Sequence, residues 1–138
     1  MIVLKSPEEI ARMQEANQIV AEILQTLKEK AKPGVTTREL DRLAEEMARK
    51  RNAACAFKGY RGYPCALCAS RNEVIVHGMP STEKLQEGDI LSLDFGVFYN
   101  GFYGDSAVTF PIGTVAEEAA QLIRTTRECL DRAIGQTG

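Results

Sequence analysis

Two aspartates in this sequence have a spacing that could do chemistry together. Asp94 and Asp105 flank the pair Asn100-Gly101, which favours a two-residue type I′ turn because both of its central positions require positive φ. In the hairpin that this turn closes, Gly96 lies opposite Asp105. Side chains alternate along a strand, so both aspartates share one face as diagonal neighbours, roughly 7–8 Å apart at the backbone.

The residues around the pair suggest a divalent-metal site. The aspartate face also carries small residues, whereas the other face is strongly apolar (Leu91, Leu93, Phe95, Val97, Phe102, Val108 and Phe110). Two carboxylates in a roomy face repel each other unless a cation or a shared proton intervenes. Oxygen ligands favour Mg²⁺ or Mn²⁺, and added imidazole extends the range to Fe²⁺, Co²⁺ or Zn²⁺. Solvated surface aspartates and a carboxylate acid–base dyad are the alternatives.

The single histidine of the chain, His77, ends a short apolar run and enters the turn Gly78-Met79-Pro80. Side chains at such turns can project into a cleft. His77 could be a metal ligand, a proton donor or a structural turn residue, and composition alone slightly favours the structural role.

Length and charge exclude several classes of protein. The chain has 138 residues, of which 44% are hydrophobic, enough for one domain with a real core. A net charge of −2 with interspersed signs and no basic stripe argues against nucleic-acid binding. No apolar run approaches the roughly 20 residues that span a bilayer, and the N-terminus lacks a signal-peptide core. We therefore expect a cytoplasmic protein without membrane or nucleic-acid partners.

The cysteines do not suggest a zinc site. The pair at positions 65 and 68 has zinc-knuckle spacing, but no second pair completes four ligands. A cytosolic chain of this size needs no disulfides to fold. We predict separate, reduced and mostly packed thiols at the four positions Cys55, Cys65, Cys68 and Cys129.

Periodicity and capping signals predict an α+β fold. Three capping boxes mark the starts of three helices: Ser6 with Glu9, Thr36 with Glu39, and Thr114 with Glu117. The first two helices should end near residues 32–34 and Asn52 and pack as an antiparallel pair. Between the second and third helices, strands are predicted at residues 53–57, 66–70, 74–76, 90–98 and 102–110. We infer a mostly antiparallel sheet with helices covering one face.

Three motifs together resemble one known family. The loop FKGYRGYP (residues 57–64), the segment NEVIVHGMP (72–80) and the hairpin LSLDFGVFYNGFYGDSAVTF (91–110) look like those of a type I methionine aminopeptidase of the bacterial kind. The resemblance covers essentially all 138 residues, and the order and spacing of the motifs carry it. It implies that residues 1–138 are a single domain, the N-terminal half of a pita-bread catalytic domain with two α/β halves around a dinuclear metal centre.

The resemblance also implies an activity and cofactors. Members of the family are metalloaminopeptidases that remove the N-terminal methionine of new polypeptides when the second residue is small. They use two divalent ions (Co, Mn, Fe or Zn) for metal-assisted hydrolysis, and some members also bind a monovalent cation.

By motif position, the resemblance assigns roles to individual residues. Asp94 and Asp105 would be metal ligands, and His77 would be a catalytic histidine that also contacts the substrate. Asn72 and Val74 would belong to a loop that binds the monovalent cation. The pocket for the methionine side chain would be lined by Phe57, Tyr60, Tyr63 and Cys68.

The chain departs from the family pattern in its ligand set. The family's remaining ligands, a histidine and two glutamates, come from the second half of the fold, and no residue of this chain replaces them. We therefore expect an isolated half with weak or no activity alone, partnered by a second copy or by a complementary second half. Two alternatives stay open: a non-catalytic or self-assembling half-domain, and a proline-specific aminopeptidase of the same fold. The FKGYRGYP loop favours methionine.

Overall fold

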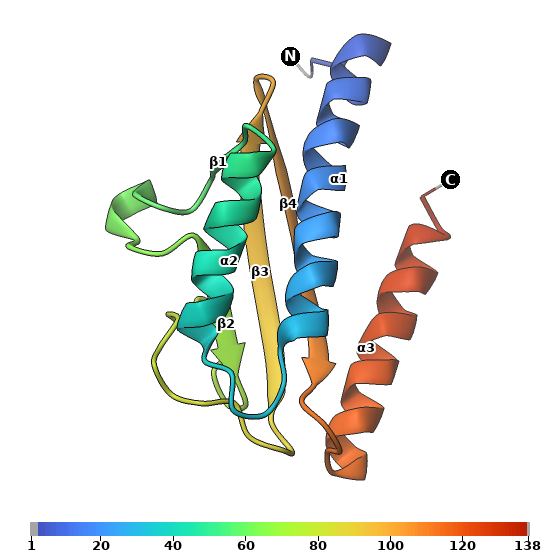
Figure 1. Ribbon diagram of the computed structural model, residues 1–138. Coiled ribbons are helices and arrows are strands. Elements are labelled where there is room, and N and C mark those ends of the chain that lie inside the picture. Colours follow the sequence, from blue (N-terminus) through green and yellow to red (C-terminus); the bar gives the residue numbers. More distant parts are fainter. Residues whose placement is uncertain (1–2, 138) are drawn as a thin grey trace.

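A long β-hairpin forms the centre of the computed structural model, which describes residues 3–137 (Figure 1). Strands β3 (Ile90–Tyr99) and β4 (Phe102–Pro111) pair antiparallel along their whole length. They turn at Asn100 and Gly101, which have φ angles of 48° and 85°. Gly96 lies opposite Asp105 and Asp94 opposite Ala107, so the predicted register is confirmed.

Two short strands complete the sheet on the other side of β3. Strand β1 (Ala54–Cys55) pairs with the end of β3, and β2 (Leu67–Arg71) pairs with its first half, both antiparallel. The predicted fold class, α+β with an antiparallel sheet, is confirmed. The strand predicted at 53–57 shrinks to two residues because the chain turns away after Phe57, whose carbonyl accepts from the Tyr60 N–H. The strand predicted at 66–70 begins and ends one residue later.

The strand predicted at residues 74–76 is wrong. Asn72 adopts a left-handed φ of 53°, and the Val74 N–H donates to the Arg71 carbonyl in a turn. The Asn72 side chain fixes this turn by accepting from the Ile90 N–H at 3.0 Å. The apolar residues that suggested a strand face outward, and Ile75 is 87% exposed. The segment is apolar but has no partner strand in the described residues, and its apolar character alone could not show this.

Helices α1 (Pro7–Lys30) and α2 (Thr37–Lys50) run in opposite directions against one face of the sheet (Figure 1). Their two predicted capping boxes are confirmed: Ser6 and Glu9 exchange side-chain and backbone hydrogen bonds, as do Thr36 and Glu39. The antiparallel helix pair and the one-sided covering of the sheet were both predicted from the sequence.

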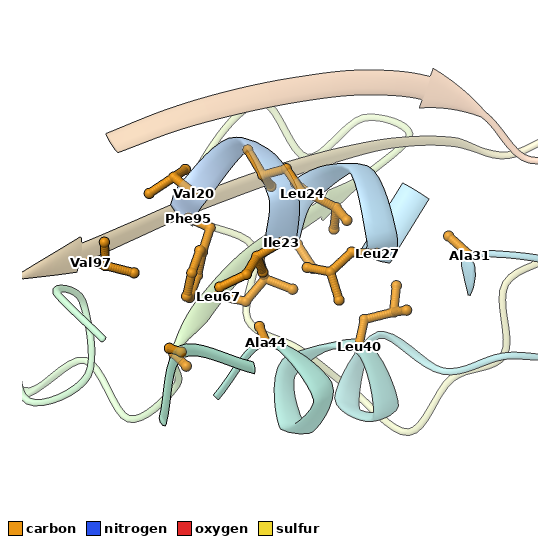
Figure 2. Packing of buried hydrophobic residues seen from close by; sticks show 14 of the residues in the cluster. Val20, Ile23, Leu24, Leu27, Ala31, Leu40, Ala44, Leu67, Phe95 and Val97 are labelled. Carbon is orange, nitrogen blue, oxygen red and sulfur yellow. The ribbon is translucent and has the colours of Figure 1, made fainter. Parts of the chain in front are cut away.

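The core lies between these two helices and the apolar face of the hairpin (Figure 2). Leu91, Leu93, Phe95 and Val97 of β3 are fully buried there, as the alternation predicted. The helices supply the facing side chains: Val20, Ile23, Leu24 and Leu27 from α1, and Leu40 and Ala44 from α2. Because the core uses one face of the hairpin, the aspartate face is left free.

Helix α3 (Glu117–Ile134) follows the end of β4, and its predicted capping box is wrong. Its N-cap is Ala116, which has no side-chain capping bond. The Thr114 N–H donates instead to the Glu87 carboxylate at 2.6 Å, and Glu117 pairs with Arg124. None of its described residues is buried. Within residues 3–137, no helix is both long and apolar enough to cross a membrane.

Candidate active site

A pocket of about 710 Å³ opens on the aspartate face of the hairpin. It brings together residues from β2, β3, β4, the 57–64 loop and the 77–79 turn. Seven residues singled out in the sequence line it: Phe57, Tyr60, Tyr63, Cys68, His77, Asp94 and Asp105. Asn72 and Val74, predicted as a cation site, do not line it. Val74 borders a separate pocket of about 290 Å³, which Gly78 and Met79 of the 77–79 turn also line.

Asp94 and Asp105 both line this pocket, and their carboxylates repel each other. Burial raises the pKa of Asp94 above its usual range, and the negative charge of Asp105 raises it further, while the nearby His77 acts in the opposite direction. Within the described residues, neither carboxylate forms a salt bridge. The pair is thus a concentration of negative charge that no cationic side chain of residues 3–137 neutralises.

This donor set fits a hard divalent cation. Carboxylate oxygens are the ligands that Mg²⁺ and Mn²⁺ prefer, and a bound cation removes the repulsion between the two groups. Among residues 3–137, however, no group of three or more histidine, cysteine, aspartate or glutamate side chains could hold a metal ion together. The two aspartates are therefore metal-ligand candidates whose remaining coordination positions would be filled by water or by ligands from outside this part of the chain.

Cys68 lies on β2 directly across from Asp94. It is buried, and burial raises the pKa of its thiol, with the charge of Asp94 adding to the effect. A protonated thiol behaves as a small apolar side chain rather than as a metal ligand. Cys68 therefore forms an apolar wall beside the carboxylates. All four cysteines are free, although Cys129 is exposed rather than packed.

The 57–64 loop, called the aromatic loop below, forms the rest of the pocket wall. Gly96 of β3 leaves room for Phe57, because a Cβ there would lie 2.9 Å from Cε1 of that ring. The loop turns through Gly59, with φ of 87°, into a short 3₁₀ helix, η1 (Tyr60–Gly62). The Arg61 guanidinium stacks 5.5 Å from the centre of the Tyr60 ring. The close approach of Phe57 to Gly96 places the loop against the aspartate face, while the stacking of Arg61 on Tyr60 lies within the loop itself.

Four pocket residues were not predicted from the sequence, and they are Arg61, Gly62, Pro64 and Met79. Each lies inside one of the motifs that carry the family resemblance, so adjacency to the predicted site residues was the available signal. The charge of Arg61 favours a solvent-facing position, yet this residue borders the pocket.

Two further residues outside the pocket brace its walls. The Asp105 N–H donates to Oδ1 of Asn17, a polar residue within the apolar stripe of α1, at 3.2 Å. The Asp41 carboxylate on α2 accepts from the N–H groups of Ala66 and Leu67 at 2.9 and 3.0 Å, which fixes the start of β2.

His77 sits at the pocket edge in a left-handed conformation, with φ of 57°. Its ring is exposed, so it can reach a ligand in the pocket. Tyr63 braces the same region, because its hydroxyl shares its one hydrogen between the carbonyls of Leu67 and Gly78, at 3.0 and 3.3 Å. Burial raises the pKa of Tyr63, so the hydroxyl stays a donor.

Comparison with known protein sequences points to one family. The profile of metallopeptidase family M24 matches residues 11–137. A methionine aminopeptidase of Clostridium acetobutylicum is 50% identical over 97% of this chain and 54% of its own length. Methionine aminopeptidase 1 of Bacillus subtilis is 42% identical over the same shares of both chains. The chain thus spans about half the length of the curated relatives it matches.

Comparison with solved structures points to the same family. A methionine aminopeptidase from Thermotoga maritima superimposes with a TM-score of 0.93 at 44% identity, covering 97% of this chain and 54% of that one. A prolidase from Pyrococcus furiosus gives a TM-score of 0.80 at 22% identity, over 95% of this chain and 37% of that one. At that identity, the likeness to the prolidase shows a shared fold and does not indicate the substrate of this chain.

Proposed function

The chain belongs to metallopeptidase family M24 and has the fold of its pita-bread enzymes, and on this premise we propose that it supplies the substrate pocket and part of the metal site of a methionine aminopeptidase. The substrate class is the N-terminal methionine of polypeptides, and the setting is the cytoplasm. Relatives at 42–50% identity carry that name, whereas likeness to prolidases extends to the fold alone.

One observation carries the proposal: a carboxylate pair, an exposed histidine and an aromatic wall meet in one pocket. Phe57, Tyr60 and Cys68 offer an apolar surface to the methionine side chain, whose thioether makes favourable contacts with aromatic ring edges. Asp94 and Asp105 line the same pocket, so a peptide whose methionine side chain contacts these residues would bring its scissile bond near the carboxylates.

The chain's own residues would divide the work as follows. Asp94 and Asp105 hold the divalent ions, which when bound supply an activated water molecule and polarise the peptide carbonyl. His77 donates a hydrogen bond to the peptide beside the carboxylates and assists proton transfer there. The aromatic loop excludes water from the methionine side chain and orients the peptide relative to the aspartates.

The remaining metal ligands must come from a complementary second half or from a second copy of the chain. Support comes from the absence of a third ligand among residues 3–137 and from the exposed outer residues of β4. A monovalent cation at Asn72 and Val74 is a further part of the proposal. It would bind main-chain carbonyls, because the Asn72 side chain already bonds to Asp89 and Ile90.

The experiment joins residues 1–138 to the remaining C-terminal part of the C. acetobutylicum relative and measures methionine release from a Met-Gly peptide with added Mn²⁺ or Co²⁺. We expect little or no release by the chain alone and turnover by the chimera. In the chimera, His77→Ala should lower kcat by about 10²-fold or more. Lys50→Ala, at an exposed helix position, is the matched control. Full activity of the chain alone that survives His77→Ala would contradict the proposal.

A further inference from the structure

The turn that carries His77 is tied to the edge of β2 opposite to β3. The Ala69 N–H donates to the Gly78 carbonyl at 2.8 Å, and the Gly78 N–H donates to Oγ of Ser70 at 3.0 Å. The contact is close, because a Cβ on Gly78 would lie 2.9 Å from Cα of Ser70 and would overlap the Ala69 carbonyl. These bonds to both polar groups of Gly78 fix the residue that directly follows His77.

Ser70 is well placed to set the position of this turn. It is 5% exposed, and its side chain lies on the same face of the sheet as Cys68 and Asp94. A buried hydroxyl needs a partner, and the Gly78 N–H is the partner that the structure gives it. Loss of the hydroxyl would leave that N–H without an acceptor at a partly buried edge.

The other side of His77 offers much less support. Ile75 and Val76, which precede it, are 87% and 63% exposed. His77 itself has a left-handed φ, which a residue with a Cβ adopts at a cost in free energy unless its neighbours hold it. The position of its ring therefore depends on the anchored residues that follow.

Those following residues are anchored to α2 as well as to β2. The Ser81 N–H donates to Oγ1 of Thr37 at 2.8 Å, and the Arg38 guanidinium donates to the Pro80 carbonyl at 3.3 Å. The Tyr63 hydroxyl donates to the Gly78 carbonyl at 3.3 Å. The backbone after His77 is thus fixed at Gly78, Pro80 and Ser81, and Ser70 makes the bond nearest to the histidine.

We propose that Ser70 is a positioning residue that acts through Gly78 to hold the His77 ring at the pocket, with the Tyr63 hydroxyl as a second anchor. The consequence of this positioning for catalysis rests on the proposed function, in which His77 contacts the peptide. The positioning itself does not rest on the proposed function, because the hydrogen bonds join residues of this chain alone.

The test uses the fact that the chain has one histidine, so a ¹H–¹³C spectrum contains one Cε1–H cross-peak from His77. The spectrum is recorded on the full chain without metal or peptide. In Ser70→Ala, the population of a displaced turn should rise about fivefold, the effect of one lost hydrogen bond, so the cross-peak shifts or broadens. Ser70→Thr keeps the hydroxyl and should restore the position of the cross-peak.

Ser92→Ala is the matched control. Ser92 lies directly across from Ser70 on β3, and its hydroxyl bonds to Thr109 at 2.7 Å. This variant loses one side-chain hydrogen bond from the same face but should leave the His77 cross-peak unchanged. A purely structural role of Ser70 would lower the urea midpoint and leave the His77 cross-peak as in the wild type, and that result would overturn the proposal.

Two further outcomes are decisive. Should Ser70→Ala fail to fold, Tyr63→Phe takes its place, because it removes the second bond to the Gly78 carbonyl. An unchanged cross-peak in Tyr63→Phe would then overturn the proposal. The spectrum does not depend on turnover. An inactive chimera would therefore contradict the proposed function without affecting the conclusion about Ser70 and the His77 ring. An active chimera together with an unshifted His77 cross-peak in Ser70→Ala would support the proposed function and overturn the positioning role of Ser70.

Discussion

At the scale of single residues, the aspartate pair differs from the other aspartates of the chain in its partners. Asp131 pairs with Arg127 at 3.2 Å, Asp89 lies 3.6 Å from Arg71, and Asp41 accepts two backbone N–H groups. Among the described residues, Asp94 and Asp105 have no such cationic partner, and the pKa of Asp94 is raised by burial and by its neighbour. A divalent cation is the partner that their chemistry favours.

Cys55 gives a pH-dependent prediction at the same scale. Burial raises the pKa of its thiol to about 11, and the charge of Glu45 adds to this. The thiolate is the reactive form, so a raised pKa means roughly a hundredfold less thiolate at pH 8 than for an ordinary thiol. Alkylation of Cys55 should be slow at pH 8 and speed up about tenfold per pH unit until about pH 11.

Mass spectrometry of the chain treated with iodoacetamide measures this rate for each cysteine. Cys129, exposed on α3, is the internal control and should be modified first. Equal rates for Cys55 and Cys129 at pH 8 would show that Cys55 is neither buried nor shifted as the structure has it.

At the scale of elements, the three capping boxes show what a short pattern can and cannot predict. The same Thr/Ser-x-x-Glu spacing occurs before all three helices. It forms for α1 and α2, but at α3 the Glu87 carboxylate takes the Thr114 N–H and Arg124 takes Glu117. A distant carboxylate and a side chain further along the same helix therefore occupy the two groups that the capping box would have joined.

This contrast predicts different costs for two matched substitutions. Thr36→Ala removes a formed cap and should lower the free energy of unfolding by about 1 kcal/mol. Thr114→Ala removes no side-chain capping bond and should change it by less than about 0.5 kcal/mol. Urea denaturation of both variants measures the two costs. Equal losses would mean that the third capping box forms after all.

Elements defined by local rules were predicted well, whereas those defined by distant partners were not. The hairpin register follows from an Asn-Gly turn and a period of two, so the shared face of Asp94 and Asp105 could be predicted from the sequence alone. The strand at 74–76 could not be excluded, because its fate depends on the bonds of Asn72 to Asp89 and Ile90. Periodicity carries no information about such partners.

The same distinction applies to the site. Seven of the residues named by motif position line one pocket, whereas Asn72 and Val74, named in the same way, do not. The supporting residues Ser70 and Asp41 were not predicted, since their roles exist only once β2, α2 and the 77–79 turn are packed. Asn17 was visible as a polar interruption of an apolar stripe, but its partner, the Asp105 N–H, was not.

At the scale of the whole molecule, one side of the described structure lacks a partner. Outward residues of the edge strand β4 are exposed, including Asp105 and Thr109. Large apolar residues of α3 are also exposed, with Leu122 at 61% and Leu130 at 53%. Open strand edges and apolar patches of this kind favour association. The chain spans about half the length of the relatives at 42–50% identity.

We therefore expect residues 1–138 alone to associate with themselves at tens of micromolar. Sedimentation velocity of the wild type should show species larger than a monomer, because the apolar face of α3 is removed from water on association. Leu122→Glu combined with Leu130→Glu should shift the chain toward monomer. Gln121→Glu adds a charge to the same helix at a polar position and should not. A wild type that sediments only as a monomer would contradict the expectation.

Calorimetric titration of the chain with Mn²⁺ tests the central claim, that Asp94 and Asp105 form part of a divalent-metal site. The wild type should bind, and Asp94→Asn or Asp105→Asn should each lower the affinity by at least about tenfold, because each removes a charged oxygen ligand. Asp131→Asn, at an exposed aspartate paired with Arg127, is the control and should bind as the wild type does. Equal Mn²⁺ affinity in the wild type and in the Asp94 and Asp105 variants would contradict the claim.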